Sequence, residues 1–409
     1  MLTPAAVSRE IHGRGPLQGR FALGDTLSAL PKLKEEYAGK VKMIYIDPPY
    51  MTGSRFEMRV RVGEEDWKRG KGSLALRTFE DPKDRDTYLA MMRRVLTACR
   101  DLLREDGMLF VHVDWRAHPH LRLMLDEIFR EENFLNEIIW AYQTGGRTRK
   151  YFSRKHDVIL FYRKSAAYDF NIEEVMVTPT EPRSNHMRRH VDPDGRVYRS
   201  VRVGGKVYTY YDDDPVAPGD VWSDLSHLQQ KDPERTGYDT QKPLKLLDRI
   251  VRCGSREGEL VMDLFAGSST TLEAARRAGR RFYGMDACPL TLNIARRRLA
   301  GCAYAIDLPL HMTEAACAAS AAAGIGFYQI TLERFVSDRD GLPAGLDAVD
   351  GWMVGFLNGT TLTVMDESFR TRRTPALKTT LELPAMDGTP VLCVCDVTGA
   401  SHYYHISVP

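Results

Sequence analysis

The run Asp47-Pro48-Pro49-Tyr50 places a carboxylate, two rigid prolines and an aromatic ring directly after the apolar segment 41–46. An exocyclic amine on adenine or cytosine is a poor nucleophile because its lone pair is delocalised into the ring. Asp47 and a carbonyl held by the prolines can accept the hydrogens of such an amine, and Tyr50 can stack on a base swung out of a duplex. The four residues therefore predict a site for an amino group on a planar base. The alternative is a turn in which proline ends a strand and aspartate caps it.

A second segment, 260–275, predicts a buried strand, a tight turn of small residues and a helix that begins near Thr270. Backbone N–H groups at such a helix N-terminus can approach a ligand closely, and the helix dipole favours a carboxylate there. The methionine carboxylate of S-adenosylmethionine suits this turn. The segment lacks both the lysine of a phosphate-binding loop and the spaced glycines of a dinucleotide fingerprint, so we expect no nucleoside triphosphate.

Asp286 ends a further short strand, 281–286, about twenty residues beyond the small-residue turn. At this spacing, α/β nucleotide sites place an acid that accepts hydrogen bonds from ribose hydroxyls. We therefore expect Asp286 to hold the adenosine ribose, and Asp263 to lie beside it at the end of the preceding strand. The alternative is a generic α/β unit in which Asp263 is a cap and Asp286 is solvated.

With both motifs present, the chain resembles the amino-methylating DNA methyltransferases, in particular the permuted beta group that includes type III Mod subunits. In that group the catalytic motif comes first, a basic variable stretch follows, and the cofactor motif comes last. Here the last part is Gln241-Lys242-Pro243-Leu244 and then Asp263-Leu264-Phe265-Ala266-Gly267. The resemblance covers roughly residues 20–300 and includes segments 23–25, 106–114 and 153–162. The chain departs from the group at Met51, where Asn often follows the tyrosine, and at Asp286, where Glu is more frequent.

The resemblance implies transfer of a methyl group from S-adenosylmethionine to N6 of adenine in duplex DNA, by base flipping and direct transfer. The implied catalytic residues are Asp47, Pro48, Pro49 and Tyr50. The implied cofactor residues are Asp25, Thr240, Lys242, Pro243, Asp263, Phe265, Ala266, Gly267, Ser268, Ser269, Thr270 and Asp286. The N4 amino group of cytosine is the alternative substrate, with RNA or a protein glutamine as lesser rivals. A catalytically silent DNA-binding specificity module is the alternative from another class.

Charge is unevenly distributed along a chain whose overall net charge is +2. Residues 143–211 contain fourteen Lys and Arg against seven Asp and Glu, a net of +7, whereas 303–409 contain six against twelve, a net of −6. The middle segment is therefore the candidate for DNA phosphates, and we assign residues 165–225 to target recognition. A β-hairpin insertion with solvated charges is the alternative. The expected DNA-binding residues are Arg147, Arg149, Lys150, Arg188, Arg189, Arg199, Arg202 and Lys206.

Apolar periodicity predicts alternating strands and helices, and hence an α/β fold with a doubly wound, mostly parallel, Rossmann-like sheet. The expected parts are an N-terminal arm (1–20), the catalytic half (21–164), the target-recognition region (165–225), the cofactor-binding half (226–302) and a small α+β domain (303–409). We expect the charged segment 51–82 to be a mobile loop beside the site. We expect 315–323 to be an alanine-rich helix.

The 409 residues, 43% of them hydrophobic, can bury a sizeable core. The chain contains no run of eighteen apolar residues and no signal-peptide pattern, so we expect a soluble, cytoplasmic protein without membrane contact. The seven cysteines form no Cys-x-x-Cys pair, so neither a metal site nor a disulfide is expected. Duplex DNA is the expected partner, and a homodimer or a restriction subunit remains open.

Overall fold

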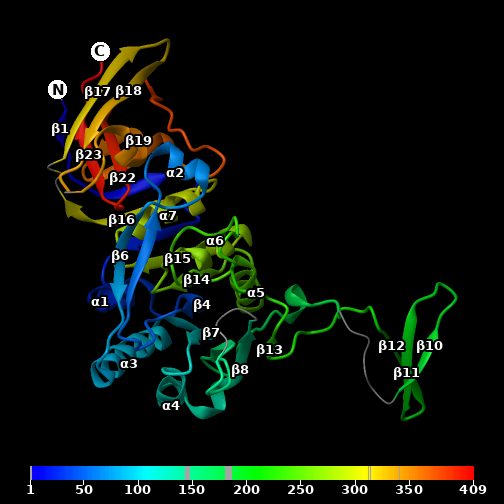
Figure 1. Ribbon diagram of the computed structural model, residues 1–409. Helices are drawn as coiled ribbons and strands as arrows, with labels where there is room; N and C mark the ends of the chain where they lie inside the picture. The colour runs from blue at the N-terminus through cyan, green and yellow to red at the C-terminus, as the bar shows by residue number, and fades with distance from the viewer. Residues whose placement is uncertain (1, 143–147, 180–186, 312, 314, 340) are drawn as a thin grey trace.

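The computed structural model describes residues 2–142, 148–179, 187–311, 313, 315–339 and 341–409 (Figure 1). Over these residues, one mixed sheet of fifteen strands runs through most of the molecule, and three small sheets accompany it. The strand order in the large sheet is β1-β23-β22-β19-β20-β2-β16-β3-β15-β14-β4-β7-β9-β8-β13. The expected α/β class, with a mostly parallel central region, is confirmed, because β16, β3, β15, β14, β4 and β7 pair in parallel.

Helices cover both faces of this parallel region. On one face, α1, α3 and α4 pack over the sheet, and on the other face α5, α6 and α7 do so. Side chains of β4 alternate between the two cores, since Ile44 and Ile46 join the first and Met43 and Tyr45 join the second. The bounds are β3 Gly19–Leu23, α1 Thr26–Tyr37, β4 Val41–Ile46, α3 Arg85–Leu102, β7 Leu103–Val113, α4 His118–Phe129, η1 Glu131–Asn133, β8 Phe134–Ala141, β9 His156–Arg163, α5 Leu244–Gly254, β14 Leu260–Asp263, α6 Thr270–Arg277, β15 Arg281–Asp286 and α7 Leu290–Leu299.

The segment after the catalytic motif is not the loop predicted for 51–82. It forms an antiparallel ribbon of β5 (Arg55–Val60) and β6 (Leu74–Glu80), joined by α2 (Gly63–Arg69). In Figure 1 the ribbon runs from the level of β4 up to α7 and the C-terminal strands. The guanidinium carbon of Arg297 on α7 lies 5.2 Å from the Trp67 ring centroid of α2, which anchors the ribbon at its far end. The high charge of segment 51–82 favoured a loop prediction, although the alternating apolar residues Phe56, Met58 and Val60 are typical of a strand.

The N-terminal residues do not form the free arm predicted for 1–20. Strand β1 (Thr3–Pro4) pairs with β23, and β2 (Val7–His12) lies between β16 and β20 in the large sheet. Glu10 of β2 is fully buried, and its Oε1 accepts a 2.7 Å hydrogen bond from Arg296 of α7. Arg296 and the paired residues of β16 lie 286 residues or more beyond this strand, so the local sequence contains no sign of these partners.

The C-terminal region is built from strands, and the prediction of an α+β domain with an alanine helix at 315–323 is wrong. Residues Ala316–Ala323 form β17, which pairs along its length with β18, and Cys317, Ala319 and Ala321 pack on the core at the two-residue period of a strand. Pairing and burial override the high helix propensity of alanine here. The remaining bounds are β16 Tyr304–His311, β18 Phe327–Val336, η3 Gly345–Ala348, β19 Val349–Asn358, β20 Thr361–Phe369, β21 Thr380–Pro384, β22 Thr389–Asp396 and β23 Ser401–His405.

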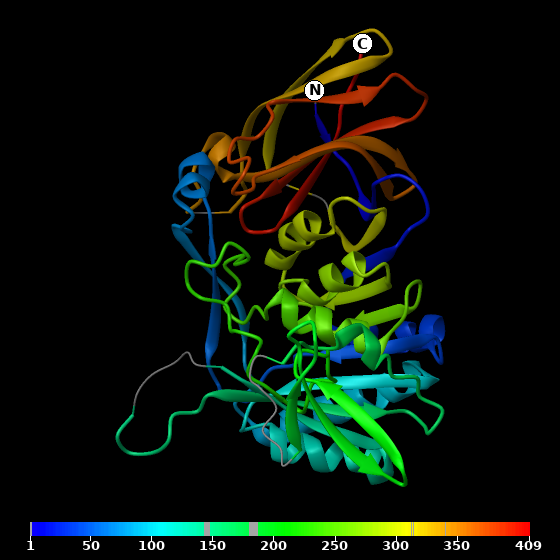
Figure 2. The same cartoon turned by 90° about the vertical axis from the view of Figure 1, so that its right-hand side faces the viewer.

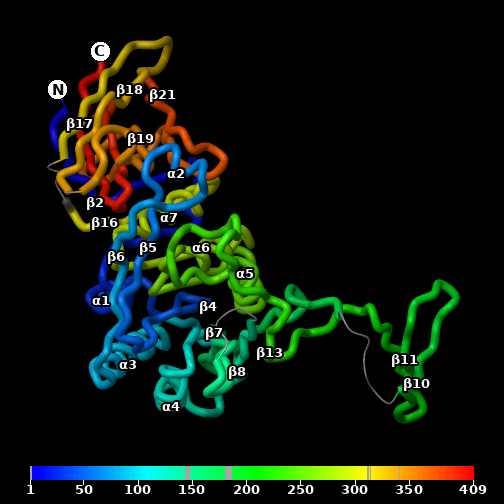
Figure 3. The backbone as a smooth tube through the Cα atoms, in the orientation of Figure 1, coloured from blue at the N-terminus to red at the C-terminus, as the bar shows by residue number. Residues whose placement is uncertain are grey.

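Between β9 and α5 the chain leaves the body of the molecule. A three-stranded antiparallel sheet of β10 (Arg188–Val191), β11 (Val197–Val203) and β12 (Lys206–Tyr211) stands apart from the rest, as the backbone tube in Figure 3 shows. The segment also contains η2 (Ile172–Val175) and the short β13 (Val221–Trp222), which pairs with β8. In the part of the chain with described coordinates, no helix is both long and apolar enough to cross a membrane.

Candidate active site

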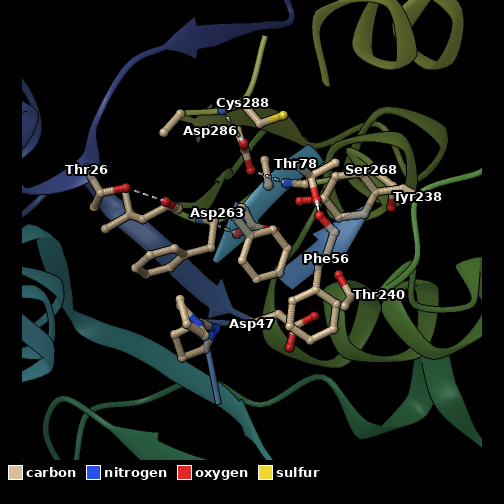
Figure 4. Close-up of a pocket in the computed structure, with 18 of the residues that line it drawn as sticks. Thr26, Asp47, Phe56, Thr78, Tyr238, Thr240, Asp263, Ser268, Asp286 and Cys288 are labelled. Carbon is tan, nitrogen blue, oxygen red and sulfur yellow. Dashed lines mark hydrogen bonds between the residues drawn. The ribbon is translucent and has the colours of Figure 1, made fainter. Parts of the chain in front are cut away.

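A cavity of about 410 Å³ opens where β4, β14 and β15 end. This is the carboxyl edge of the parallel strands, where the chain leaves β4 toward β7 on one side and β14 toward β15 on the other. Open α/β sheets bind ligands at such a switch point. Figure 4 shows Asp47 at one end of the cavity, Asp286 at the other and Asp263 between them. Two motifs that are more than 200 residues apart in sequence therefore face one cavity.

At the Asp47 end, both carboxylate oxygens already accept hydrogen bonds. The hydroxyl of Tyr50 donates to Oδ1, and the ammonium of Lys242 donates to Oδ2. Lys242 Nζ also lies 3.1 Å from the Tyr50 hydroxyl oxygen. Burial, followed by the charge of Asp47, raises the pKa of Tyr50 well above its ordinary value, so the neutral phenol is the donor. Lys242, which the resemblance assigned to the cofactor, thus lies in contact with two of the predicted catalytic residues, Asp47 and Tyr50.

Asp81 fixes the loop that follows the catalytic motif. Its carboxylate accepts from the backbone N–H groups of Tyr50 at 3.3 Å and Thr52 at 3.1 Å, and from the Thr52 hydroxyl at 2.6 Å. Asp81 is only 3% exposed, so these bonds compensate the loss of its hydration. The loop includes Met51 at φ +57°, a backbone conformation that needs such support. Asp81 was missed because it follows the ribbon, whose folding the sequence did not reveal.

At the other end, the small-residue turn closes around Asp286. One carboxylate oxygen accepts from the N–H of Gly267 at 2.7 Å, and the other accepts from the N–H of Cys288 at 2.8 Å. Gly267 has φ +45°, and a Cβ there would meet the Tyr238 ring at 3.1 Å. A side chain at position 267 would therefore strain the turn and crowd the cavity.

The two strand-end acids on this side are held in an environment that disfavours charge. Burial raises the pKa of Asp263 to about 7 and that of Asp286 to about 6. Hydrogen bonds from Phe265 to Asp263 and from Gly267 and Cys288 to Asp286 only partly offset burial. Perturbed acids grouped in one cleft are typical of functional sites. A ligand that donates hydrogen bonds to them restores part of the lost solvation.

An aromatic wall closes one side of the cavity. Phe56 and Phe79 of the ribbon stack with ring centroids 4.7 Å apart, and Phe79 lies 6.4 Å from Tyr238 at a 25° angle. Met58 forms a backbone bridge with Tyr238, and Arg59 N donates to Gly237 O at 3.3 Å. Parallel rings and apolar lining suit a planar heterocycle. The alternation of apolar residues from 56 to 60 was the available sequence signal for this wall.

The cavity lining includes all four predicted catalytic residues and ten of the twelve predicted cofactor residues. The ten are Asp25, Thr240, Lys242, Asp263, Phe265, Ala266, Gly267, Ser268, Thr270 and Asp286. Pro243 and Ser269 lie outside the lining. Pro243 is the N-cap residue of α5, and Ser269 is a buried residue at φ +58° that turns the chain into α6. Asp25 caps α1 through a 2.8 Å bond from Ser28 N and also faces the cavity.

The predicted DNA-binding residues lie on two separate segments. Arg188, Arg189, Arg202 and Lys206 are exposed on the projecting sheet, while Arg149 and Lys150 are exposed in the segment between β8 and β9. Arg199 differs from these, because its guanidinium Nε donates to Asp212 at 3.2 Å and its side chain is only 12% exposed. Arg147 lies outside the described residues.

Nucleophilic catalysis by a cysteine lacks support at this site. Burial raises the pKa of the lining thiol Cys288 to about 11, so it is not a thiolate nucleophile at neutral pH. Among the residues with described positions, no group of three His, Cys, Asp or Glu is arranged to hold a metal ion.

The sequence is similar to those of known DNA methyltransferases. The sequence model of a DNA methylase family matches residues 41–297, more than half of the chain. The type II methyltransferase M.EcaI of Enterobacter cloacae is 26% identical over 330 residues, which cover 69% of this chain and 70% of that protein. The DNA adenine methyltransferase YhdJ of Escherichia coli K12 is 28% identical over 278 residues, covering 68% and 81%. The Mod subunit of the type III enzyme StyLTI of Salmonella typhimurium is 26% identical over 319 residues, covering 62% of this chain and 49% of the subunit.

Proposed function

The chain belongs to the DNA methylase family of the N6/N4 type, and from this premise we propose that it methylates N6 of adenine in duplex DNA, with S-adenosylmethionine as methyl donor. The observation that carries the proposal is the single cavity that Asp47-Pro48-Pro49-Tyr50 and the Asp263 to Gly267 turn share. The relative YhdJ is named for adenine, which supports adenine over cytosine. The Asp that leads the catalytic motif favours adenine as well. The N4 amino group of cytosine is the second candidate, since it offers nearly the same donors.

The residues present fit S-adenosylmethionine. The half-buried Asp286 carboxylate is available to ribose hydroxyls, and glycine at position 267 leaves the cavity free of a Cβ that would meet Tyr238. Phe56 and Tyr238 offer apolar faces for the adenine of the cofactor. Asp25 and Thr240 line the cavity and are proposed for the methionine end. A volume of about 410 Å³ lies within the ordinary range of small-molecule sites.

In the proposed mechanism, the residues of this chain orient the amine of the target base, and the methyl donor supplies the electrophilic group. When bound, S-adenosylmethionine supplies a methyl group activated by its sulfonium. Asp47 and the Pro48 carbonyl accept the two hydrogens of the adenine amine and direct its lone pair toward the donor side of the cavity. Tyr50 supports the extruded base by stacking. The amine becomes acidic only when alkylated, so its proton leaves after transfer, and positioning supplies most of the acceleration.

We further propose that the exposed basic side chains of β10–β12, together with Arg149 and Lys150, contact DNA phosphates. In this proposal, residues 165–225 are the target-recognition region, 21–164 and 226–302 are the two halves of the catalytic domain, and the protein works in the cytoplasm. A restriction subunit is proposed as one protein partner, since one relative is named as a Mod subunit, and a second copy of this chain is the alternative.

The test is incubation of the protein with labelled S-adenosylmethionine and mixed-sequence duplex DNA, followed by digestion to nucleosides. Labelled N6-methyladenine, absent with Asp47→Ala, is the expected result. The control is S-adenosylmethionine binding to Asp47→Ala, which should be retained because the cofactor turn is intact. N4-methylcytosine instead moves the function to the second candidate. Cofactor binding without any labelled nucleoside contradicts the proposal and favours the silent DNA-binding module.

A further inference from the structure

Phe152 is unusual among the described residues because its side chain is 99% exposed. Its neighbour Tyr151 is also 59% exposed. Apolar rings left in water on a connecting segment are typical of surfaces that bind a partner. In Figure 2 the segment 148–155 extends outward at the left, on the side along which the β5–β6 ribbon runs.

The strand register puts the base of this segment at the catalytic edge of the sheet. Ile46, the residue before Asp47, pairs with Val111 of β7, and Val113 at the end of β7 pairs with Val158 at the start of β9. The described residues 148–155 therefore join the start of β9 at the edge of the sheet where Asp47 lies. The side chains agree with the register, because Tyr142 donates to Asp157 at 3.1 Å and Asp157 contacts His112, whose ring lies 6.4 Å from Tyr50.

The surroundings of Phe152 are basic. Residues 148–156 contain four Lys and Arg and no Asp or Glu. The guanidinium carbon of Arg154 lies 4.1 Å from the exposed Trp115 ring centroid and 5.2 Å from that of Tyr151. The guanidinium carbon of Arg116 also lies over the Trp115 ring, 4.6 Å from its centroid. These cation–π contacts hold Tyr151 and Arg154 near Trp115, whereas Phe152 stays exposed among positive charges, which complement a phosphate backbone.

We propose that Phe152 is a wedge that enters the stack of a DNA duplex next to the target base and fills the space that the extruded base leaves. The proposal rests on the proposed function and adds the residue that opens the duplex. Apolar side chains inserted between base steps replace part of the lost stacking, and so reduce the cost of unpairing a base. Arg149, Lys150 and Arg154 then hold the phosphates on either side of the wedge.

The experiment compares Phe152→Ser and Phe152→Leu with a matched control, Ile325→Ser. Ile325 is 98% exposed but lies between β17 and β18, in the C-terminal region. The DNA carries the site that wild-type protein methylates, in two forms: fully paired, or with a mismatched base opposite the target adenine. Rates give kcat and KM, and 2-aminopurine at the target position reports extrusion by its fluorescence. Because position 152 is fully exposed, the substitutions should leave the melting temperature unchanged.

With paired DNA, Phe152→Ser should lower kcat/KM by about tenfold or more and reduce the 2-aminopurine signal, because unstacking is no longer compensated. Phe152→Leu should retain most activity, and Ile325→Ser should equal wild type. With the mismatched duplex, the loss in Phe152→Ser should shrink to about twofold, since that base is already unpaired. An equal loss on both duplexes, or no loss on either, overturns the wedge while the proposed function stands. If the wild-type protein methylates no DNA, that result contradicts the proposed function and, with it, the role proposed for Phe152.

Discussion

Lys242 and Asp47 lie 195 residues apart in sequence, and in the folded chain the ammonium of Lys242 donates to Oδ2 of Asp47. Both side chains are largely buried, at 10% and 16% exposure. Lys242 also contacts the Tyr50 hydroxyl at 3.1 Å, so lysine, carboxylate and phenol form one cluster. A buried carboxylate loses hydration, and these two donors replace part of it and hold the carboxylate in one orientation before a base arrives.

Replacement of Lys242 by Met should therefore impair turnover more than cofactor binding. We expect kcat to fall by about 10- to 100-fold, since a hydrogen bond to a charged group contributes about 1.5–3 kcal/mol. The Kd for S-adenosylmethionine should stay within about twofold of wild type, because the ammonium faces Asp47. Steady-state rates and calorimetric titration measure the two quantities. Lys245→Met, on the exposed side of α5, is the matched control. A large rise in Kd with unchanged kcat would return Lys242 to the cofactor site.

Cofactor affinity should depend on pH through Asp286. Burial raises the pKa of this carboxyl to about 6, and only the ionised form accepts from two ribose hydroxyls. As pH falls below about 6, the protonated fraction grows and affinity should drop, with a limiting slope of about tenfold per pH unit. Asp286→Asn should bind about 10- to 100-fold more weakly at pH 8 and lose the step near pH 6. Titrations from pH 5 to 8 measure this, with the exposed Asp387→Asn as control. A step near pH 6 that persists in Asp286→Asn would assign the titration to another group.

Asp263 should reduce the stability of the free protein at high pH. Its folded pKa, about 7, lies above the usual value of 3.8, so the folded state binds the proton more tightly than the unfolded state. Stability from this group is thus highest below pH 4 and declines as pH rises through 7. Asp263→Asn, which keeps an oxygen for the 3.0 Å bond from Phe265 N, should melt higher than wild type at pH 8 and about equally at pH 4. Thermal melts without cofactor test this, and a difference that is constant with pH contradicts the assignment.

The projecting sheet should contribute electrostatic binding energy. Replacing Arg188, Arg189 and Arg202 by Gln should weaken DNA binding and lower the slope of log K against log salt by up to about 0.9 per lost phosphate contact. Arg196→Gln is the matched control, because Arg196 directly precedes β11 and its Nη2 already pairs with Asp213 at 2.7 Å. Binding isotherms over a salt series report the slope. An unchanged slope in the triple variant would exclude this sheet from the phosphate contacts.

The chain order of the two motifs and their chemistry could be predicted from sequence. Each motif is local: a strand of apolar residues ends in an acid, and the turn that follows needs prolines or glycine at fixed positions. Asp47, Asp263 and Asp286 were therefore found at strand ends, and parallel pairing then brings those ends to one edge. The α/β class followed from the same alternation of strands and helices.

Only the tertiary structure decided what depends on distant partners. Arg296 pairs with Glu10 inside the fold, which makes the N-terminal segment a strand instead of an arm. The alanine-rich segment 316–323 forms β17 because it pairs with β18 by backbone hydrogen bonds and packs on the core there. Asp81 accepts hydrogen bonds from the loop after Tyr50 only because the β5–β6 ribbon brings it back to that loop. Lys242 likewise reached Asp47 through the packing of α5 against the sheet. The local sequence pattern indicates which secondary structure a segment prefers and which of its faces is buried. The contacts described here depend instead on which distant segment supplies the missing charge, hydrogen bond or apolar surface.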